Sequence, residues 1–443
     1  MLLSLRTLEK EVDKIKGAAK NILLFFVLAF IALPSFGQDD STVTQVSDSP
    51  HQSIAFDVDS AVNSYIDVLS DEEQEKSDSY FEGGYWLILW GFLVDVVIAW
   101  IFLSLGLSRW MKNVCMKVKR VNLQNLIFVG LYMVFSFILA FPYSLYVNFI
   151  REHRYDLSNM SFGGWFGEEL IDLAVNLVLV GILLVIIYWV IRKTREKWWI
   201  WASAVCSVFI FIVIFISPVF ISPLFNEYSE LPEGELKAEI LSLARANGIP
   251  TDHVYQFDAS KQSKRISANV SGIGKTIRIS LNDNLLNRCS DAEIKAVMAH
   301  EMGHYVLNHI PIFVLVFTLL FLLGFGLSHL SFNYLNARFG KRWNISGISD
   351  IGGLPLLVVI LSFYMVLATP ITNNLTRSTE TEADIFGLNA AREPDGFASV
   401  AMMTSEYRKV SPGHWEEIFF YDHPSPHSRV LMAMKWKAEN LDR

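Results

Sequence analysis

Residues 171–191 read IDLAVNLVLVGILLVIIYWVI, an almost unbroken apolar run. An α-helix needs about 20 apolar residues to cross a bilayer, so this run predicts a membrane span. Similar runs lie elsewhere in the chain, at about 21–36, 85–107, 125–149, 199–222, 310–330 and 354–372. The sequence therefore predicts a mainly α, polytopic membrane protein with about seven transmembrane helices.

The composition agrees with membrane insertion. Of the 443 residues, 52% are hydrophobic and 19% are charged, against about a quarter charged in an ordinary soluble domain. These values exclude a purely soluble or a disordered chain. The net charge of −8 leaves no basic surplus, so membrane lipids are expected partners and nucleic acid is not. The three cysteines form no Cys-x-x-Cys pair, so neither a disulfide framework nor a cysteine metal site is predicted.

The N-terminal region has two interpretations. Lys14, Lys16 and Lys20 precede the apolar run at 21–36, and small and polar residues follow it, which is the layout of a secretory signal. Residues 1–37 are therefore a signal-like segment or an uncleaved first transmembrane segment. Residues 38–84 are polar and acidic, and they predict a soluble loop.

The remaining chain alternates between apolar and polar stretches. Transmembrane helices two to five are expected within 85–222, and helices six and seven within 310–372. The polar, periodic stretches 223–309 and 373–443 are expected to form a small α+β catalytic portion.

The loop charges predict an orientation. Basic residues gather between 109 and 120 and between 192 and 197, whereas the alternate loops are acidic or mixed. The positive-inside rule places these two basic loops in the cytoplasm. By parity, the stretch 223–309 falls on the outer side of the membrane.

The pattern His-Glu-x-x-His occurs at His300, Glu301 and His304. On a helix, the two histidines project from one face and can bind one zinc ion, while the glutamate can reach a zinc-bound water as a general base. A helix is expected because Ser290 and Glu293 form a candidate capping box and no helix breaker follows. Two solvated histidines on a surface helix are the alternative.

Zinc at such a site needs a third protein ligand and leaves its fourth position to water. A longer motif would have Gly at position 307 and His at 310, but Leu307 and Ile310 stand there. The alternative is a carboxylate from the helix that continues the last apolar run, where Glu380 and Asp384 share one face. One of them can bind the metal while the other hydrogen-bonds a ligand histidine.

Two nearby polar side chains are expected to stay outside the site. His309 lies five residues after His304, on a different helix face. Glu382 points away from the face shared by Glu380 and Asp384. Removing Glu382 is therefore expected to leave zinc binding nearly normal.

Two further stretches could serve a peptide substrate. Near the C-terminus, the sequence DHPSPHSR makes a rigid turn, in which His423 or Arg429 could stabilise the oxyanion formed when water attacks a peptide carbonyl. Ser267, Ala268 and Asn269 begin a stretch that alternates like a hairpin or edge strand, along which zinc proteases commonly hold their substrates. An ordinary surface turn and a plain structural hairpin are the alternatives.

These features together resemble the type I CAAX prenyl proteases, a family of polytopic membrane zinc metalloproteases. The likeness covers about residues 65–429. Its landmarks are SPLF at 222–225, LPEG at 231–234, the strand at Asn269, HEMGH at 300–304, Glu380 with Asp384, and His423-Pro424 with Arg429. The resemblance implies seven transmembrane helices around a large internal chamber, with one zinc ion at one end.

The resemblance also implies roles for individual residues. It implies that zinc is bound by His300, His304 and Glu380, with Glu301 as the catalytic base. It implies that Asp384 is a supporting acid or proton donor. The C-terminal pair of landmarks, His423 and Arg429, matches the positions that face the substrate carbonyl.

Three functions are compatible with these features. The first is a zinc endopeptidase that trims the C-terminus of lipid-modified proteins, and the second is a general quality-control protease of the membrane. The third is a catalytically dead chamber that binds lipids or peptides. The family's prenylated substrates are cytosolic, whereas the loop charges favour an exterior active site. The signal-like start fits a bacterial inner membrane, with the endoplasmic reticulum membrane as the alternative.

Overall fold

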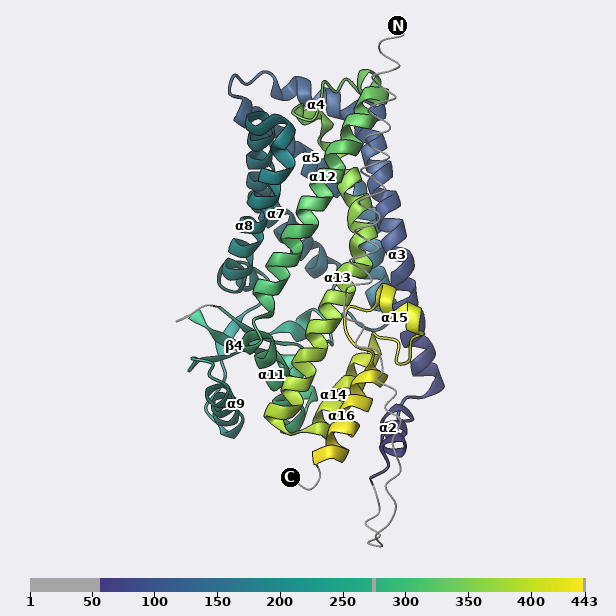
Figure 1. The fold of residues 1–443 in the computed structure, drawn as a ribbon, viewed down its shortest axis with the longest axis vertical. Coiled ribbons are helices and arrows are strands. Elements are labelled where there is room, and N and C mark those ends of the chain that lie inside the picture. Colours follow the sequence, from purple (N-terminus) through teal and green to yellow (C-terminus); the bar gives the residue numbers. More distant parts are fainter. Residues whose placement is uncertain (1–55, 273–275, 441–443) are drawn as a thin grey trace. The chain divides into compact units, whose positions relative to one another are not determined.

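The computed structural model describes residues 56–272 and 276–440 (Figure 1). The signal-like segment 1–37, with the first expected membrane segment, lies outside the described residues, as does the first part of the acidic stretch 38–84.

The membrane portion is built from long apolar helices. Within the described ranges, five helical stretches are long and apolar enough to cross a membrane: Asp71–Ser104, Val121–Arg154, Phe162–Leu224, His309–Trp343 and Ile351–Ala391. The third contains two helices, α7 (Phe162–Thr194) and α8 (Trp198–Ile216), which pack against each other across the short η2 (Arg195–Lys197). Six predicted apolar runs fall on these stretches, while the total of seven spans and the internal chamber stay predictions.

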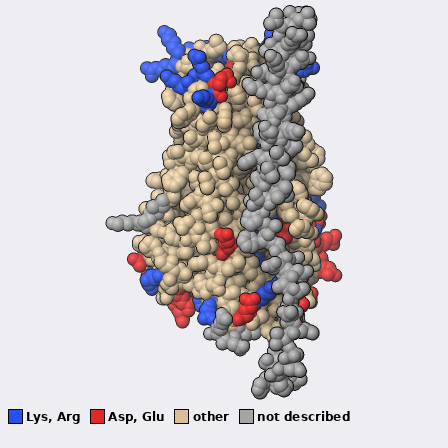
Figure 2. All heavy atoms as spheres, in the orientation of Figure 1, with Lys and Arg blue, Asp and Glu red and all other residues tan. Residues whose placement is uncertain are grey.

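The apolar faces of these helices point outward. The most apolar stretch of α12 (His309–Trp343) has a mean hydropathy of 2.7. Only 6% of that stretch is buried inside the molecule. An exposed surface of this kind fits lipid rather than water. Figure 2 shows the corresponding band, almost free of charged side chains, between two charged ends. The inner helix is α13 (Leu354–Ala391), whose most apolar stretch is 50% buried.

The described part of the acidic stretch, expected to be a soluble loop, is helical. Residues 58–66 form α2, and α3 (Asp71–Ser104) begins well before the apolar run at 85. The helix starts where it does because Ser70 and Glu73 form a capping box, and acidic residues in the first turn favour the positive end of the helix dipole.

The catalytic portion contains a small sheet with helices around it. Its strands are β1 (Tyr228–Glu230), β2 (Val254–Phe257), β3 (Ala268–Ser271) and β4 (Arg278–Asn282), in the order β1-β2-β4-β3. Strand β4 pairs parallel with β2 and antiparallel with β3, so β3 is an outer strand. The expected hairpin and the α+β character are confirmed.

Shorter elements complete the chain. They are α4 (Leu107–Cys115), η1 (Leu145–Ile150), α6 (Arg151–Arg154), η3 (Ser217–Ile221), η4 (Ser222–Leu224), α9 (Glu235–Ala246), η5 (Ala259–Lys261), α10 (Asp283–Arg288), α11 (Asp291–Val306), η7 (Ile351–Gly353), α14 (Pro394–Met403), η8 (Thr404–Glu406), α15 (His414–Phe420) and α16 (Pro426–Asn440), with α5 (Val121–Ser144) in the membrane portion. Two separate cores result. One lies among the membrane helices and includes Phe102 and Trp198, and the other joins the sheet to α9 and α11 and includes Ile279 and Met298.

The end of the molecule farthest from the sheet is basic. It carries α4, the turn between α7 and α8, and the last turn of α12 with Lys341 and Arg342. Figure 2 shows lysine and arginine gathered there. The third basic turn, at the end of α12, adds to the two basic loops read from the sequence.

An ion pair between Lys112 and Asp350 connects two elements at this basic end. Lys112 Nζ lies 2.6 Å from Asp350 Oδ2, which also accepts hydrogen bonds from the backbone N–H and hydroxyl of Ser346, each at 3.0 Å. The other oxygen, Oδ1, accepts from the backbone N–H of Gly352 at 3.0 Å. Asp350 therefore ties α4 to the start of α13.

Candidate metal and catalytic centre

Two glycines let the helices of the site approach closely. A Cβ atom on Gly303 of α11 would lie 3.1 Å from the Cα of Ala383 on α13, and one on Gly387 would lie 3.0 Å from the backbone nitrogen of His300. Larger residues would force the two helices apart. The capping box at the start of α11 is present as predicted, with the Glu293 carboxylate accepting from the N–H of Ser290 at 2.7 Å.

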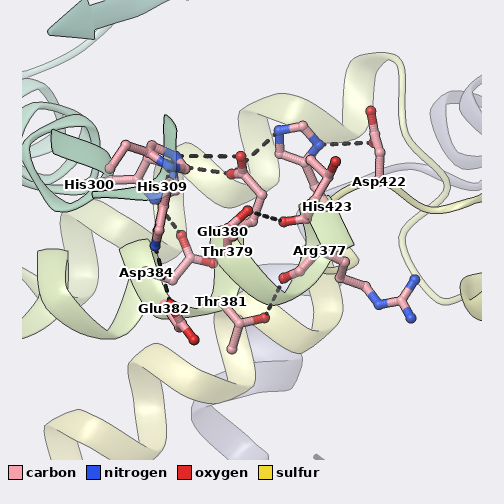
Figure 3. A network of polar contacts seen from close by, with 12 residues as sticks. His300, His309, Arg377, Thr379, Glu380, Thr381, Glu382, Asp384, Asp422 and His423 are labelled. Atoms are coloured by element: carbon pink, nitrogen blue, oxygen red, sulfur yellow. Dashed lines mark hydrogen bonds and ion pairs between the residues drawn. The ribbon is translucent and has the colours of Figure 1, made fainter. Parts of the chain in front are cut away.

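Two histidines of α11 and one glutamate of α13 converge, and Figure 3 shows His300 and Glu380 of this group. His300 Nε2 lies 3.2 Å from His304 Nε2 and 3.2 Å from Glu380 Oε2, and His304 Nε2 lies 3.4 Å from Glu380 Oε1. The three potential ligand atoms all lie within 4.8 Å of one another, so these residues could hold a metal ion. Between the two carboxylates left open by the sequence, it is Glu380 that faces both histidines.

Asp384 contacts the far side of His300. Its Oδ1 lies 2.7 Å from His300 Nδ1, and the Asp384 side chain is fully buried. Arg429 of α16 binds both oxygens of Asp384, through Nε at 2.9 Å and Nη2 at 2.5 Å. Burial opposes a charge on His300, but Asp384 and Glu380 outweigh it and raise the pKa of the ring. Surroundings that favour a proton on His300 also favour a metal cation beside it.

A second chain of contacts reaches His304. Its Nδ1 lies 2.8 Å from Nδ1 of His309, and Nε2 of His309 lies 3.2 Å from Glu382 Oε2. The expectation that His309 lies on another face is wrong, because α11 ends at Val306 and Asn308 adopts the left-handed conformation (φ 57°), which changes the direction of the chain. Asparagine after a helical segment was the available signal for this turn.

Glu301 lines a cavity of about 270 Å³ beside the three clustered residues. Burial raises the pKa of Glu301 to about 7, a range in which a carboxylate can take up and release protons near neutral pH. Burial and the neighbouring His300 lower the pKa of His304 to about 4, which keeps that ring neutral. A neutral ring can offer a lone pair to a metal.

The C-terminal turn reaches the same cavity. His423 Nε2 lies 3.4 Å from Glu380 Oε2, and His423 Nδ1 lies 2.9 Å from Asp422 Oδ1 (Figure 3). Arg429 also lines the cavity, but both oxygens of Asp384 occupy its guanidinium. Sequence reasoning assigned no role to the remaining lining residues from α14, η8 and the residues after it: Phe397, Val400, Thr404, Tyr407 and Arg408.

Strand β3 borders the cavity at its beginning. Ser267 and Ala268 line the cavity, whereas Asn269 is not among the lining residues. Ser267 accepts a hydrogen bond from the backbone of Asn282, and Asn269 faces Ser280 two residues further along. In an antiparallel pair the bonded positions alternate, so the backbone groups of Ala268 point away from β4, toward the open edge.

Comparison with known proteins covers both portions of the chain. Residues 59–227 match the CAAX prenyl protease N-terminal region, described as five membrane helices, and residues 230–437 match peptidase family M48. YhfN of Bacillus subtilis, an uncharacterized metalloprotease, is 31% identical over 63% of this chain and 66% of its own length. CAAX prenyl protease 1 of Saccharomyces cerevisiae is 31% identical over 58% of this chain and 56% of its own length.

A solved structure shares the fold. The crystal structure of S. mikatae Ste24p has a TM-score of 0.70 and 24% identity, covering 83% of this chain and 90% of that chain. The sequence alignments span 66% of the Bacillus relative and 56% of the yeast relative, so parts of both lie outside them. Since family models match both the membrane portion and the portion with the His-His-Glu cluster, the chain is an integral, multi-pass membrane protein and belongs to peptidase family M48.

Proposed function

We propose that this chain is a zinc-dependent membrane endopeptidase that hydrolyses peptide bonds with a metal-activated water. One observation carries the proposal: two imidazoles and one carboxylate converge beside Glu301 at the wall of a cavity. Membership of a peptidase family supports it, as do relatives named as metalloproteases.

The donor set fits one zinc ion per chain. Two imidazole nitrogens and one carboxylate oxygen form a known catalytic zinc set, which leaves a fourth position for water or substrate. A zinc ion held by His300, His304 and Glu380 supplies Lewis acidity, which makes water more acidic and polarises a carbonyl oxygen.

Glu301 is the proposed general base. Its carboxylate lines the cavity next to the ligand histidines and takes the proton of the attacking water. The protonated carboxyl group can then return that proton to the leaving amine.

His423 is the proposed partner of the developing negative charge on the substrate carbonyl. Asp422 accepts from Nδ1 and fixes the ring, so that Nε2 points toward the site. When the ring carries its second proton, Nε2 donates to the carbonyl oxygen. This hydrogen bond strengthens as charge develops, so it accelerates the chemical step.

Asp384 and Arg429 are proposed to orient a ligand. Asp384 is fully buried and both of its oxygens bind Arg429, so it acts on the reaction through His300 rather than as a proton donor. Arg429 holds Asp384 in place, and this role fits its contacts better than a direct role at the substrate carbonyl.

The substrate is proposed to add a strand to the edge of β3. Ser267 and Ala268 lie at the cavity, and the outward backbone groups of Ala268 can pair with an extended peptide. Asn269 would then bind only peptide further from the metal. Pairing through the main chain tolerates many side chains, which suits a protease with varied substrates.

Two substrate classes follow from two observations. The match to CAAX prenyl proteases supports lipid-modified proteins cleaved near the C-terminus. The basic end opposite the catalytic portion supports an active site outside the cytoplasm, where a quality-control protease of a bacterial inner membrane would work. No contact in the described residues favours the third function, a catalytically dead chamber.

Zinc content and hydrolysis of a peptide by the purified wild-type protein test the enzymatic proposal. A protein that binds zinc and cleaves the peptide, with both properties removed by a chelator and restored by zinc, supports it. A metal-free protein with full peptidase activity would contradict it. A comparison of membrane-protein termini in cells with and without the enzyme then separates trimming of lipid-modified C-termini from general degradation.

Cysteine labelling in intact cells tests the side of the membrane. Single cysteines at Lys119, near the basic end, and at Glu233, in the catalytic portion, are exposed to a reagent that cannot cross the membrane. The loop charges predict labelling at Glu233 alone. Labelling at Lys119 alone would make the active site cytosolic and favour prenylated substrates.

A further inference from the structure

His309 is a buried histidine outside the group of metal-binding candidates. It is the first residue of α12, and its side chain is 1% exposed. Nδ1 lies 2.8 Å from Nδ1 of His304, and Nε2 lies 3.2 Å from Oε2 of Glu382 on α13. Both ring nitrogens therefore have partners, and one partner is a proposed zinc ligand.

The positions of the protons follow from these contacts. Nε2 of His304 faces Glu380 and must offer its lone pair to a metal, so the neutral ring carries its proton on Nδ1. That proton can be donated only if Nδ1 of His309 is unprotonated. Neutral His309 then carries its own proton on Nε2, where Glu382 accepts it.

The opposite arrangement would block the metal. If His309 carried its proton on Nδ1, its partner nitrogen on His304 would have to accept, and the His304 proton would move to Nε2. A protonated Nε2 has no lone pair for a metal. The carboxylate of Glu382 opposes this arrangement because it accepts a hydrogen bond and cannot donate one when ionised.

We infer that His309 and Glu382 form a relay that fixes His304 in its metal-binding tautomer. Both are positioning residues, and the inference rests on the proposed metal binding at His304. The two ligand histidines are then oriented in different ways. His300 contacts the buried Asp384 directly, whereas His304 reaches the half-exposed Glu382 through a second imidazole.

Zinc affinity, measured by competition with a chelator, tests the relay. His309→Ala leaves the Nδ1–H of His304 without an acceptor, and the affinity is expected to fall about 10- to 100-fold, as for other partners of ligand histidines. The matched control is His329→Ala on the same helix. His329 also has partners at both ring nitrogens, Trp198 at Nδ1 and Glu196 with Asn333 at Nε2. None of them belongs to the metal cluster, so zinc affinity is expected to stay unchanged.

Rescue separates positioning from packing. In His309→Asn, the amide oxygen can accept from His304 as the ring nitrogen does, so most of the affinity is expected to return. Glu382→Gln keeps an acceptor oxygen for His309, whereas Glu382→Ala removes it. Zinc affinity is therefore expected to fall further in the alanine variant than in the glutamine variant. The contact between Glu382 and His309 thus replaces the expectation, drawn from the helix face alone, that removing Glu382 leaves zinc binding nearly normal. The absorption spectrum of the cobalt-substituted protein is expected to change in His309→Ala and to recover in His309→Asn.

The outcomes are distinct. Wild-type affinity and a wild-type cobalt spectrum in His309→Ala, or no recovery in His309→Asn, would reduce His309 to a packing residue. If His309→Ala does not fold, equal affinities in Glu382→Ala and Glu382→Gln would overturn the relay. A wild-type protein without zinc affinity would defeat the proposed function and the relay together. Zinc binding by wild-type protein that His309→Ala leaves unchanged defeats the relay alone.

Discussion

The two ends of α13 each carry a buried cluster of charges, and the clusters differ in how those charges are paired. At the basic end, Asp350 meets Lys112 and receives hydrogen bonds from Ser346 and Gly352. At the catalytic end, three carboxylates face one guanidinium. They are Glu301, Glu380 and Asp384, with Arg429 as the cation.

The way in which the charges are paired distinguishes a cluster that stabilises the fold from a cluster that could bind a metal. A buried charge is stable when the chain itself supplies its partners, as it does for Asp350. Around His300, the carboxylates of Asp384 and Glu380 favour a positive charge, and the ligand atoms of the His-His-Glu group lie within 4.8 Å of one another. Such a cluster calls for a cation from outside the chain. Changes at the catalytic end should therefore alter metal binding or turnover, while changes at the basic end should alter stability.

The largest effect is expected from Glu380→Ala. Zinc loses one of its three protein ligands, so its affinity should fall by more than the 10- to 100-fold typical of a lost outer partner, and turnover should disappear with it. Metal analysis after dialysis and peptide hydrolysis measure the two effects. Glu417→Ala, on the nearby α15, is the control and should keep its zinc. Full zinc occupancy in Glu380→Ala would contradict the assignment of the cluster at the catalytic end as a metal site.

Glu301→Gln should separate chemistry from metal binding. The amide cannot accept the proton of the attacking water, so turnover should fall by about 1000-fold or more. Zinc content should stay at the wild-type level, because Glu301 is outside the group of ligand atoms. Single-turnover kinetics and metal analysis on the same sample measure both. Turnover close to that of the wild type would remove Glu301 from the role of base.

His423→Ala should have an intermediate effect. Loss of one donor to the developing oxyanion typically lowers kcat by about 100-fold, with little change in substrate binding. Steady-state kinetics with a peptide substrate distinguish kcat from KM. Asp422→Asn keeps the imidazole of His423 but weakens the hydrogen bond that orients it, so kcat should fall less than in His423→Ala. A normal kcat in His423→Ala would make the C-terminal turn purely structural.

Ala268→Pro should weaken substrate binding modestly. Proline removes one outward N–H from the edge of β3, and such an edge tolerates proline. Losing one neutral hydrogen bond corresponds to about 1 kcal/mol, so kcat/KM should fall about fivefold, mainly through KM. Ala268→Ser keeps the N–H and is the matched control. Equal kcat/KM in both variants would argue against an added substrate strand.

Asp350→Asn should have the smallest effect on catalysis. Lys112 would lose its buried partner, at a cost of about 3 kcal/mol in the free energy of unfolding. Zinc affinity and kcat of the folded protein should stay at wild-type values. Thermal denaturation and metal analysis in the same lipid environment measure both. A loss of zinc without a loss of stability would show that the two ends of α13 are not independent.

Local patterns in the sequence predicted the membrane helices and part of the candidate metal site. Apolar runs predicted the membrane helices because lipid imposes a length on each, and the pair His300 and His304 followed from helical periodicity. Helical periodicity could not predict the contacts that follow the turn at Asn308. A single left-handed residue changes the direction of the chain there, and His309 contacts His304, against the expected helical face.

Long-range partners also escaped sequence reasoning. Helical spacing alone left the choice between Glu380 and Asp384 open, and only the family resemblance pointed to Glu380. The choice depends on how α11 crosses α13, where Gly303 allows a close contact. The tie between Lys112 and Asp350 joins residues far apart in the chain. Neither contact produces a periodic pattern that can be recognised in a single sequence.

The helix α13 continues without interruption from the membrane portion to the metal site. It has 38 residues and is about 57 Å long at 1.5 Å per residue, and Glu380 lies near its far end. Pro370 lies inside α13 and removes one backbone hydrogen bond, but the helix is continuous across it. We therefore expect a tilt imposed by a thinner or thicker bilayer to displace Glu380 relative to His300 and His304 on α11. At the proposed zinc site, the thickness of the bilayer would then affect the distances between the three candidate ligands. The rate of peptide hydrolysis should therefore depend on the acyl-chain length of the surrounding lipid.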